Sequence, residues 1–124
     1  MCGVTGLFST QKNNQLDLTI RQMSDAIVHR GPDGDGFWVN KDDGVGLGHR
    51  RLAILDLSDA GKQPMISPSG RYVMSYNGEI YNYLDLKSEL ETKGHKFRGH
   101  SDTEILLTAF EEYGISDALQ KVSG

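Results

Sequence analysis

Hydrophobic positions along the chain follow two different spacings. Small and apolar residues alternate over Cys2–Ser9, which is typical of a strand with one buried face. Apolar residues then recur at spacings of four, three and four positions from Leu16 to Ile27, which predicts an amphipathic helix over residues 16–28. Similar patterns predict further strands at Phe37–Val39, Val45–Leu55, Tyr72–Ser75 and Lys96–Arg98.

The second half of the chain is dominated by helical patterns. A helix is predicted over Asn82–Lys93, with Asn82 as its N-cap and Gly94 at its end. Ser101-Asp102-Thr103-Glu104 has the pattern of a capping box before a helix that Gly114 would end, and a last helix is expected over 117–122. The order before this last helix, β-α-β-β-β-α-β-α, indicates a mixed α/β or α+β layered domain.

Between these elements lie segments rich in turn-forming residues. His29–Gly36 is dense in Gly, Pro and Asp, Asp42–Gly44 is typical of a hairpin turn, and residues 57–69 read as a loop. No closing element follows the last predicted helix, and so few strands would form a small, one-sided sheet with exposed edges. We therefore expect residues 1–124 to be the N-terminal portion of something longer.

The bulk composition excludes several classes of protein. The 124 residues suit one domain, with 37% hydrophobic and 24% charged residues. A net charge of −4 without any basic run argues against a nucleic-acid partner. No stretch approaches the roughly 18 apolar residues of a membrane helix, and the start lacks the layout of a signal peptide. The single cysteine fits a reducing cytoplasm, and the scattered histidines show no metal-ligand spacing.

Cys2 is the residue with the most evident chemistry, because it directly follows Met1. Aminopeptidases remove Met before a small residue, so the mature chain would begin with a cysteine that carries both a thiol and a free α-amine. An adjacent amine that titrates near neutral pH can take the proton of the thiol and so activate it as a nucleophile. Taken alone, a cysteine at position 2 is also explained by coincidence.

Five sequence motifs, which occur in a fixed order, make a coincidental cysteine at position 2 a poorer explanation. They are Met1–Val4 (MCGV), His29–Gly34 (HRGPDG), Arg51–Asp56 (RLAILD), Asn77–Asn82 (NGEIYN) and Ser101–Glu104 (SDTE). Together they resemble the glutaminase domain of glutamine-dependent asparagine synthetases, which are class II glutamine amidotransferases. The resemblance implies an α+β fold, the αββα sandwich of the N-terminal-nucleophile hydrolases, present here only as its N-terminal portion.

The resemblance assigns the catalytic roles to three residues. Cys2 would be the nucleophile, and Asn77 and Gly78 would form the oxyanion hole through a side-chain amide and a backbone N–H. Such donors are needed because thiolate attack on an amide builds negative charge on the carbonyl oxygen. The residues alone equally allow a type I′ turn at Asn77-Gly78.

Substrate recognition is assigned in the same way. The guanidinium of Arg51 would hold the α-carboxylate of glutamine with paired hydrogen bonds, and Asp102, assisted by Glu79, would hold its α-ammonium group. The resemblance places three further residues along the pocket: Leu52, Ile54 and Leu55. Each of the two charged residues also has a purely structural explanation at this point. Arg51 could be a solvated residue of a strand, and Asp102 could be an acid that the helix dipole favours in the first turn.

Two neighbouring features receive a structural interpretation. Arg50 departs from the acidic residue of some relatives, and we expect it to be exposed. A triad of His29 and Asp33 with Cys2 is not the first choice, because the terminal amine can act as the base. The loop that contains them is expected near the site as a structural wall, with Gly31 and Gly34 permitting turns that other residues could not make.

The resemblance also implies the partners. Glutamine would be hydrolysed to glutamate and ammonia, and a C-terminal domain would use the ammonia in an ATP-dependent amidation of aspartate. We expect no cofactor or metal in this domain, ATP and Mg in the synthetase domain, no membrane partner, and a sheet edge that allows a homodimer. Residues 1–124 alone are expected to be weakly active or inactive. The alternatives are another acceptor, such as a sugar acid or a peptide, or a non-catalytic domain that keeps the fold.

Overall fold

The computed structural model describes residues 1–11, 15–52 and 59–124 and divides into two compact units. The first unit contains β1 (Gly3–Phe8), α1 (Leu16–Asp25), a 3-10 turn η1 (Val28–Arg30), β2 (Gly34–Asn40) and β3 (Val45–Arg51), with the segments Lys62–Pro64 and Ser75–Asn77. The second contains a 3-10 turn η2 (Asp59–Gly61), β4 (Met65–Ile66), β5 (Val73–Met74), α2 (Tyr83–Thr92), α3 (Asp102–Tyr113) and α4 (Ile115–Lys121).

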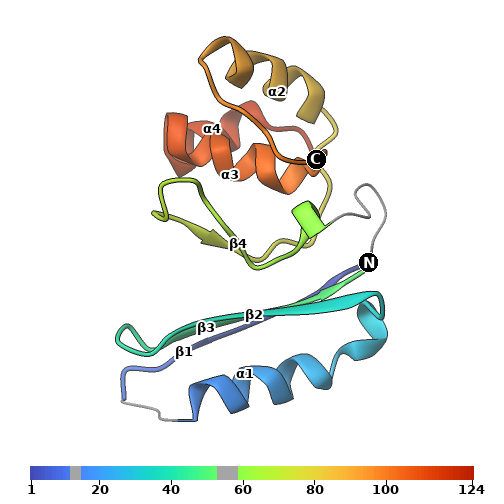
Figure 1. The fold of residues 1–124 in the computed structure, drawn as a ribbon, viewed down its shortest axis with the longest axis vertical. Helices are drawn as coiled ribbons and strands as arrows, with labels where there is room; N and C mark the ends of the chain where they lie inside the picture. The colour runs from blue at the N-terminus through green and yellow to red at the C-terminus, as the bar shows by residue number, and fades with distance from the viewer. Residues whose placement is uncertain (12–14, 53–58) are drawn as a thin grey trace. The chain divides into compact units, whose positions relative to one another are not determined.

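The first unit is an antiparallel sheet in the order β1-β3-β2, with α1 lying along one of its faces (Figure 1). Leu16 and Ile20 of α1 are fully buried, and they contact β3 at Gly46 and Gly48. A Cβ atom at Gly48 would collide with the hydroxyl groups of Ser24 and Thr5, so only glycine lets the helix approach this closely. The alternate residues of each strand lie on the opposite face of the sheet, away from α1.

The second unit has a helical core formed by α2, α3 and α4. Its fully or nearly fully buried members are Leu86, Leu90, Ile105, Ala109 and Ala118. Leu86 and Leu90 lie one turn apart on α2, as the apolar spacing predicts, and Gly94 ends this helix with a φ of 95°. The β4 and β5 strands form a separate two-stranded antiparallel pair within this unit.

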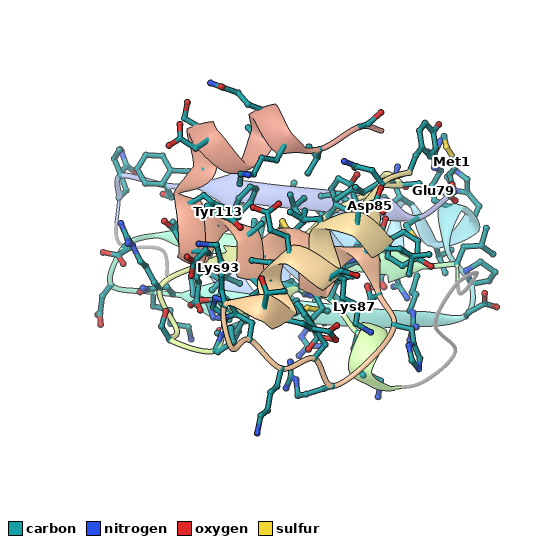
Figure 2. The ribbon with its side chains drawn as sticks, turned by 90° about the horizontal axis from the view of Figure 1, so that it is seen from above. Met1, Glu79, Asp85, Lys87, Lys93 and Tyr113 are labelled. Carbon is teal, nitrogen blue, oxygen red and sulfur yellow. The ribbon has the colours of Figure 1, made fainter. Side chains whose placement is uncertain are left out.

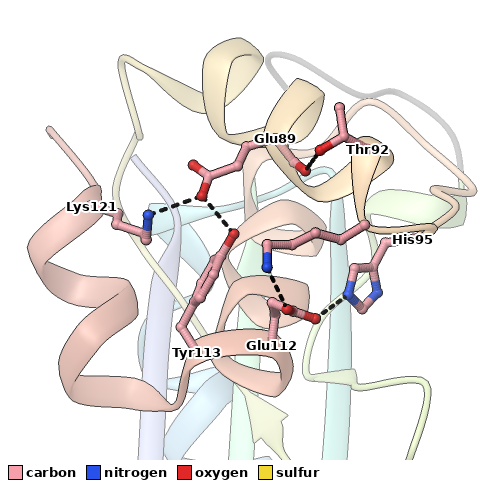
Figure 3. Close-up of polar contacts among 7 residues, drawn as sticks. Glu89, Thr92, His95, Glu112, Tyr113 and Lys121 are labelled. Carbon is pink, nitrogen blue, oxygen red and sulfur yellow. Dashed lines mark hydrogen bonds and ion pairs between the residues drawn. The ribbon is translucent and has the colours of Figure 1, made fainter.

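Polar side chains connect the three helices at the surface of the second unit (Figure 3). Glu89 of α2 accepts hydrogen bonds from Tyr113 at 2.8 Å and from Lys121 at 3.0 Å, while Glu112 of α3 pairs with Lys93 at 2.9 Å. Figure 2 shows Lys93 beside Tyr113, with its Nζ 5.3 Å from the ring centroid. Burial and the Glu89 hydrogen bond raise the pKa of Tyr113 to about 12, so its hydroxyl stays a donor at neutral pH.

Most of the predicted elements are present, with shifted ends. The helix expected over 16–28 ends at Asp25 and continues as η1, and β2 begins at Gly34 rather than at Phe37. The hairpin turn is confirmed at Gly44, which has a φ of 69°. The part of the predicted strand Val45–Leu55 beyond Leu52 lies outside the described residues, and β4 lies where only a loop was expected.

The strand predicted at Lys96–Arg98 is wrong, and Glu104 supplies the physical reason. Its buried carboxylate accepts the backbone N–H groups of Arg98 at 2.9 Å and Gly99 at 3.0 Å, so these amides are not offered to a neighbouring strand. The same contacts divert Glu104 from the predicted capping box. Ser101 alone caps α3, by accepting the N–H of Thr103 at 3.2 Å.

Asn82 is the N-cap residue of α2, as predicted, but its side chain makes no capping hydrogen bond. Its Nδ2 donates to the carbonyl oxygen of Lys121 at 2.8 Å, and its Oδ1 accepts the N–H of Ser123 at 2.9 Å. The strands are antiparallel and the helices of the second unit follow them in sequence, so the α+β class is confirmed. In the described part of the chain, no helix is long and apolar enough to cross a membrane.

Candidate active site

The Cys2 thiol lies where the start of β1 meets the end of β3. Its Sγ is 3.3 Å from the backbone nitrogen of Leu52 and 3.5 Å from the carbonyl oxygen of the same residue. The side chain is half-buried. The sulfur is therefore held at the end of the sheet by the backbone of Leu52, and the nucleophile role of Cys2 stays a prediction.

The pleat of β3 sends two neighbouring arginines to opposite faces of the sheet. Arg50 pairs in register with Gly3 and Asp35 and turns toward α1, where its Nε donates to the carbonyl oxygen of Ser24 at 3.1 Å and its guanidinium pairs with Asp25. Its side chain is only 12% exposed. The expectation of an exposed Arg50 is therefore wrong, because α1 presents it with the oxygens of its last turn.

Arg51 points to the other face of the sheet and is half-buried. Continuing the register of β1 and β3 by one residue sets Cys2 opposite Arg51, and the two side chains therefore share the face away from α1. The alternation along β3 thus separates Arg51 from Arg50, and the substrate-binding role of Arg51 stays a prediction.

The loop between η1 and β2 lies against this end of β3. A Cβ at Gly31 would be 2.6 Å from the carbonyl carbon of Arg51, and the N–H of Asp33 donates to the Arg51 oxygen at 3.0 Å. The loop expected as a wall thus lies beside Arg51. The turn role predicted for Gly31 is wrong, because its φ of −152° is open to any residue, and glycine is needed there for close approach instead. Gly34 is different, because it is an ordinary residue of β2 whose added Cβ would meet its nearest neighbour at 4.0 Å. The role predicted for Gly34 is wrong, and His29 is exposed.

The segment Ser75–Asn77 is attached to β3 by side chains. Ser75 Oγ donates to the Gly48 oxygen at 3.1 Å, His49 Nε2 is 3.2 Å from the Tyr76 oxygen, and Gln63 Oε1 accepts the N–H of Tyr76 at 2.6 Å. Asn77 follows at once and is exposed.

A type I′ turn at Asn77-Gly78 is excluded by the backbone. Such a turn needs a positive φ at both central residues, and neither Asn77 nor Gly78 has one. The oxyanion-hole role of Asn77 and Gly78 stays a prediction.

His49 is held in its neutral form. Burial lowers the pKa of His49, the hydrogen bond to the Tyr76 oxygen opposes this shift in part, and the charge of Arg51 lowers the pKa further. Because a carbonyl oxygen only accepts, the ring proton must lie on Nε2. The sequence patterns assigned no functional role to His49 or to Gln63. The sequence could have pointed to His49 through its spacing, because it lies two positions before Arg51 on the same strand and therefore on the same sheet face.

Asp102 is the first residue of α3 and is 6% exposed. Its Oδ2 accepts the N–H of Ile80 at 2.9 Å, which ties the helix N-terminus to the segment that carries the exposed Glu79. Within the described part of the chain, the Thr103 hydroxyl lies 3.5 Å from its Oδ1. The dipole interpretation of Asp102 and its assignment as an ammonium ligand are therefore compatible.

The predicted site residues are divided between the two units. Cys2, Arg51, Leu52 and Asn77 belong to the first, and Gly78, Glu79 and Asp102 belong to the second. The two remaining predicted pocket residues, Ile54 and Leu55, lie outside the described residues. Among the residues that the structure does describe, no group of three His, Cys, Asp or Glu side chains could hold a metal ion.

Comparison with known proteins shows the family to which the chain belongs. The model of the glutamine amidotransferase domain matches residues 1–124, which is the whole chain. The chain belongs to the glutamine amidotransferase domain family. The resemblance drawn from the five motifs is thereby confirmed.

Relatives of this amidotransferase domain are several times longer than the chain. It is 44% identical over 128 residues to asparagine synthetase [glutamine-hydrolyzing] 1 of Bacillus subtilis, a match that covers all of this chain and 20% of the relative. A putative asparagine synthetase [glutamine-hydrolyzing] 2 of Methanocaldococcus jannaschii is 37% identical, over all of this chain and 26% of its own length. Amidase chry2 of Gibberella zeae is 45% identical over 92 residues, or 74% of this chain and 14% of the relative. The chain thus spans about a quarter or less of each of these relatives.

Proposed function

We propose that this amidotransferase domain is a glutaminase whose nucleophile is Cys2. The observation that carries the proposal is the placement of Cys2 and Arg51 on one sheet face, where a thiol and a carboxylate-binding cation can meet the same amino acid. We further propose that the α+β fold is the αββα sandwich of the N-terminal-nucleophile hydrolases.

The reaction proceeds in two stages once Met1 has been removed. The free α-amine of Cys2 takes the thiol proton, and the sulfur attacks the side-chain carbonyl carbon of glutamine. Asn77 and Gly78 donate hydrogen bonds to the resulting oxyanion. The C–N bond then breaks, the amine returns a proton to the departing nitrogen, and ammonia leaves a glutamyl thioester on Cys2. Water attacks the thioester and releases glutamate and the thiol.

Substrate recognition uses the two ends of the amino acid. Arg51 binds the α-carboxylate, and Asp102 binds the α-ammonium through the oxygen that does not hold the Ile80 amide. Glu79 assists Asp102 with a second negative charge, and Leu52, Ile54 and Leu55 complete the pocket.

The whole protein is proposed to be an asparagine synthetase, in which a C-terminal domain with ATP and Mg uses the ammonia to amidate aspartate in the cytoplasm. The identity to the relatives named as glutamine-hydrolysing asparagine synthetases supports this proposal. The domain is also 45% identical to amidase chry2, a relative that is not named as an asparagine synthetase, so an amidotransferase for another acceptor is the second candidate.

Covalent labelling tests the nucleophile directly. Cys2 is the only cysteine of the 124 residues, so the glutamine analogue diazo-oxo-norleucine should add one mass adduct to the Met1-free protein and none to Cys2→Ala. Retaining Met1 should suppress the labelling, because the amine then lies in a peptide bond. Equal labelling of Cys2→Ala would refute the assignment.

The two neighbouring arginines supply a matched control. Arg51→Gln should slow labelling by the analogue at least tenfold, since a lost charged hydrogen bond is worth about 1.5–3 kcal/mol, while labelling by iodoacetamide stays unchanged. Arg50→Gln removes the same charge from the opposite face and should leave both rates near those of the unmodified sequence. Equal effects of both substitutions would contradict a specific role for Arg51.

A further inference from the structure

Both backbone polar groups of Tyr76 are bound by buried side chains. Gln63 Oε1 accepts its N–H at 2.6 Å, and His49 Nε2 donates to its carbonyl oxygen at 3.2 Å. His49 is 1% exposed and Gln63 is 9% exposed, so both contacts are shielded from water. Tyr76 is not part of a strand, and these side chains therefore provide the hydrogen bonds that a sheet would otherwise supply.

The two hydrogen bonds that hold Tyr76 also restrict the backbone of the next residue, Asn77. The carbonyl group of Tyr76 and the nitrogen of Asn77 lie in one planar peptide unit, so fixing the carbonyl fixes the plane from which Asn77 continues. Asn77 itself is exposed and lies outside any helix or strand. A donor that stabilises an oxyanion must be in place before charge develops, because a side chain that has to reorient loses much of its effect.

We propose that His49 and Gln63 are positioning residues of the glutaminase reaction, which hold the Tyr76 backbone so that the Asn77 amide points at the developing oxyanion. This inference rests on the proposed function, and specifically on the donor role of Asn77. His49 serves as a neutral donor through Nε2, and Gln63 serves as an acceptor through Oε1.

The location of His49 supports a role at the site rather than in general packing. In the sheet register His49 lies opposite Val4, two residues from Cys2, and the side chains of all three residues share the face away from α1. The strand β3 thus connects the thiol end of the site to the segment that carries the oxyanion donor. Ser24 and Thr5 form a comparable hydrogen bond, 2.9 Å long, on the opposite face of the same sheet.

A double-mutant cycle in the full-length protein tests the proposal. The kcat and KM for glutamine hydrolysis are measured for His49→Leu, Gln63→Leu, Asn77→Ala and the two double variants with Asn77→Ala. Each Leu variant should lower kcat about 10- to 100-fold, since a displacement of ~1 Å can reduce a rate about 100-fold, with little change in KM. In the Asn77→Ala background the same substitutions should lower kcat less than threefold, because the donor that they position is already gone.

Two controls separate positioning from simple destabilisation. His49→Gln keeps an amide donor near the position of Nε2 and should recover most of the lost kcat, and if His49→Leu does not fold, Gln63→Leu and His49→Gln carry the test. Ser24→Ala removes a buried hydrogen bond from the helix side of the sheet and should leave kcat unchanged.

The outcomes are distinguishable. Equal losses from the Leu substitutions in both backgrounds, or no loss in either, would overturn the positioning role. An unchanged kcat in Asn77→Ala would instead overturn the proposed oxyanion hole.

Discussion

At the scale of single residues, neighbours in the sequence have unrelated roles because the pleat of β3 separates them. Arg50 is bound to the last turn of α1, whereas Arg51 shares a face with Cys2. The composition of the two positions does not reveal this division, because both are arginine. Gly31 and Gly34 form a second such pair, since the first touches the backbone of β3 and the second has room for a side chain.

The two glycines give a prediction of stability. Gly31→Ala places a methyl group against the backbone of Arg50 and Arg51, which cannot move aside as a flexible side chain can, and should lower the free energy of unfolding by about 1–3 kcal/mol or more. Gly34→Ala should change it by less than about 0.5 kcal/mol. Urea unfolding of both variants measures the difference. Equal destabilisation by the two substitutions would contradict the close approach at Gly31.

At the scale of elements, local patterns identified the long helices well and the short strands poorly. The apolar spacing from Leu86 to Leu90 placed α2 because a helix of this length repeats its signal over several turns. The strand predicted at Lys96–Arg98 is too short to repeat its apolar pattern in this way. In the structure the N–H of Arg98 donates to the carboxylate of Glu104, six residues further along the chain. The strand β5 lies within the strand predicted at Tyr72–Ser75, whereas its partner β4, of two residues, is too short to produce a pattern of its own.

The helix α2 offers a matched test of its buried face. Leu90 is fully buried against α3 and α4, so Leu90→Ala should cost about 2–5 kcal/mol of unfolding free energy. Leu84, on the same helix, is 61% exposed, and Leu84→Ala should change stability by less than about 0.5 kcal/mol. Chemical denaturation followed by circular dichroism reports both values. Similar losses in the two variants would show that α2 buries a different face.

At the scale of the whole molecule, the buried polar residue His49 links stability to pH. The pKa of His49 is lowered from its ordinary value of 6.5, chiefly by burial, with the charge of Arg51 acting in the same direction and the Tyr76 hydrogen bond against it. The unfolded chain therefore takes up the proton first as the pH falls through 6.5. Folding loses stability below this pH and is unaffected by the group above it.

Replacement of the ring tests this dependence. His49→Gln cannot titrate but keeps a donor, so the difference in unfolding free energy between the two proteins should shift in favour of the variant as the pH is lowered below 6.5. A shift of one pKa unit corresponds to about 1.4 kcal/mol, which sets the scale of the effect. The fluorescence of Trp38, the only tryptophan, follows unfolding of the sheet that contains His49. A parallel pH dependence of the two proteins would exclude His49 as the source.

The sequence by itself determined the α+β class, the main helices and the family, because these depend on local spacing and on motifs that can be read along the chain. It also named the thiol, the amide and the charged residues of the candidate site. The tertiary structure decided which of two adjacent arginines faces Cys2, which glycine is needed for close approach, and that His49 and Gln63 bind the backbone before Asn77. These features arise from contacts between residues more than ten positions apart in the sequence, and no local pattern encodes such contacts.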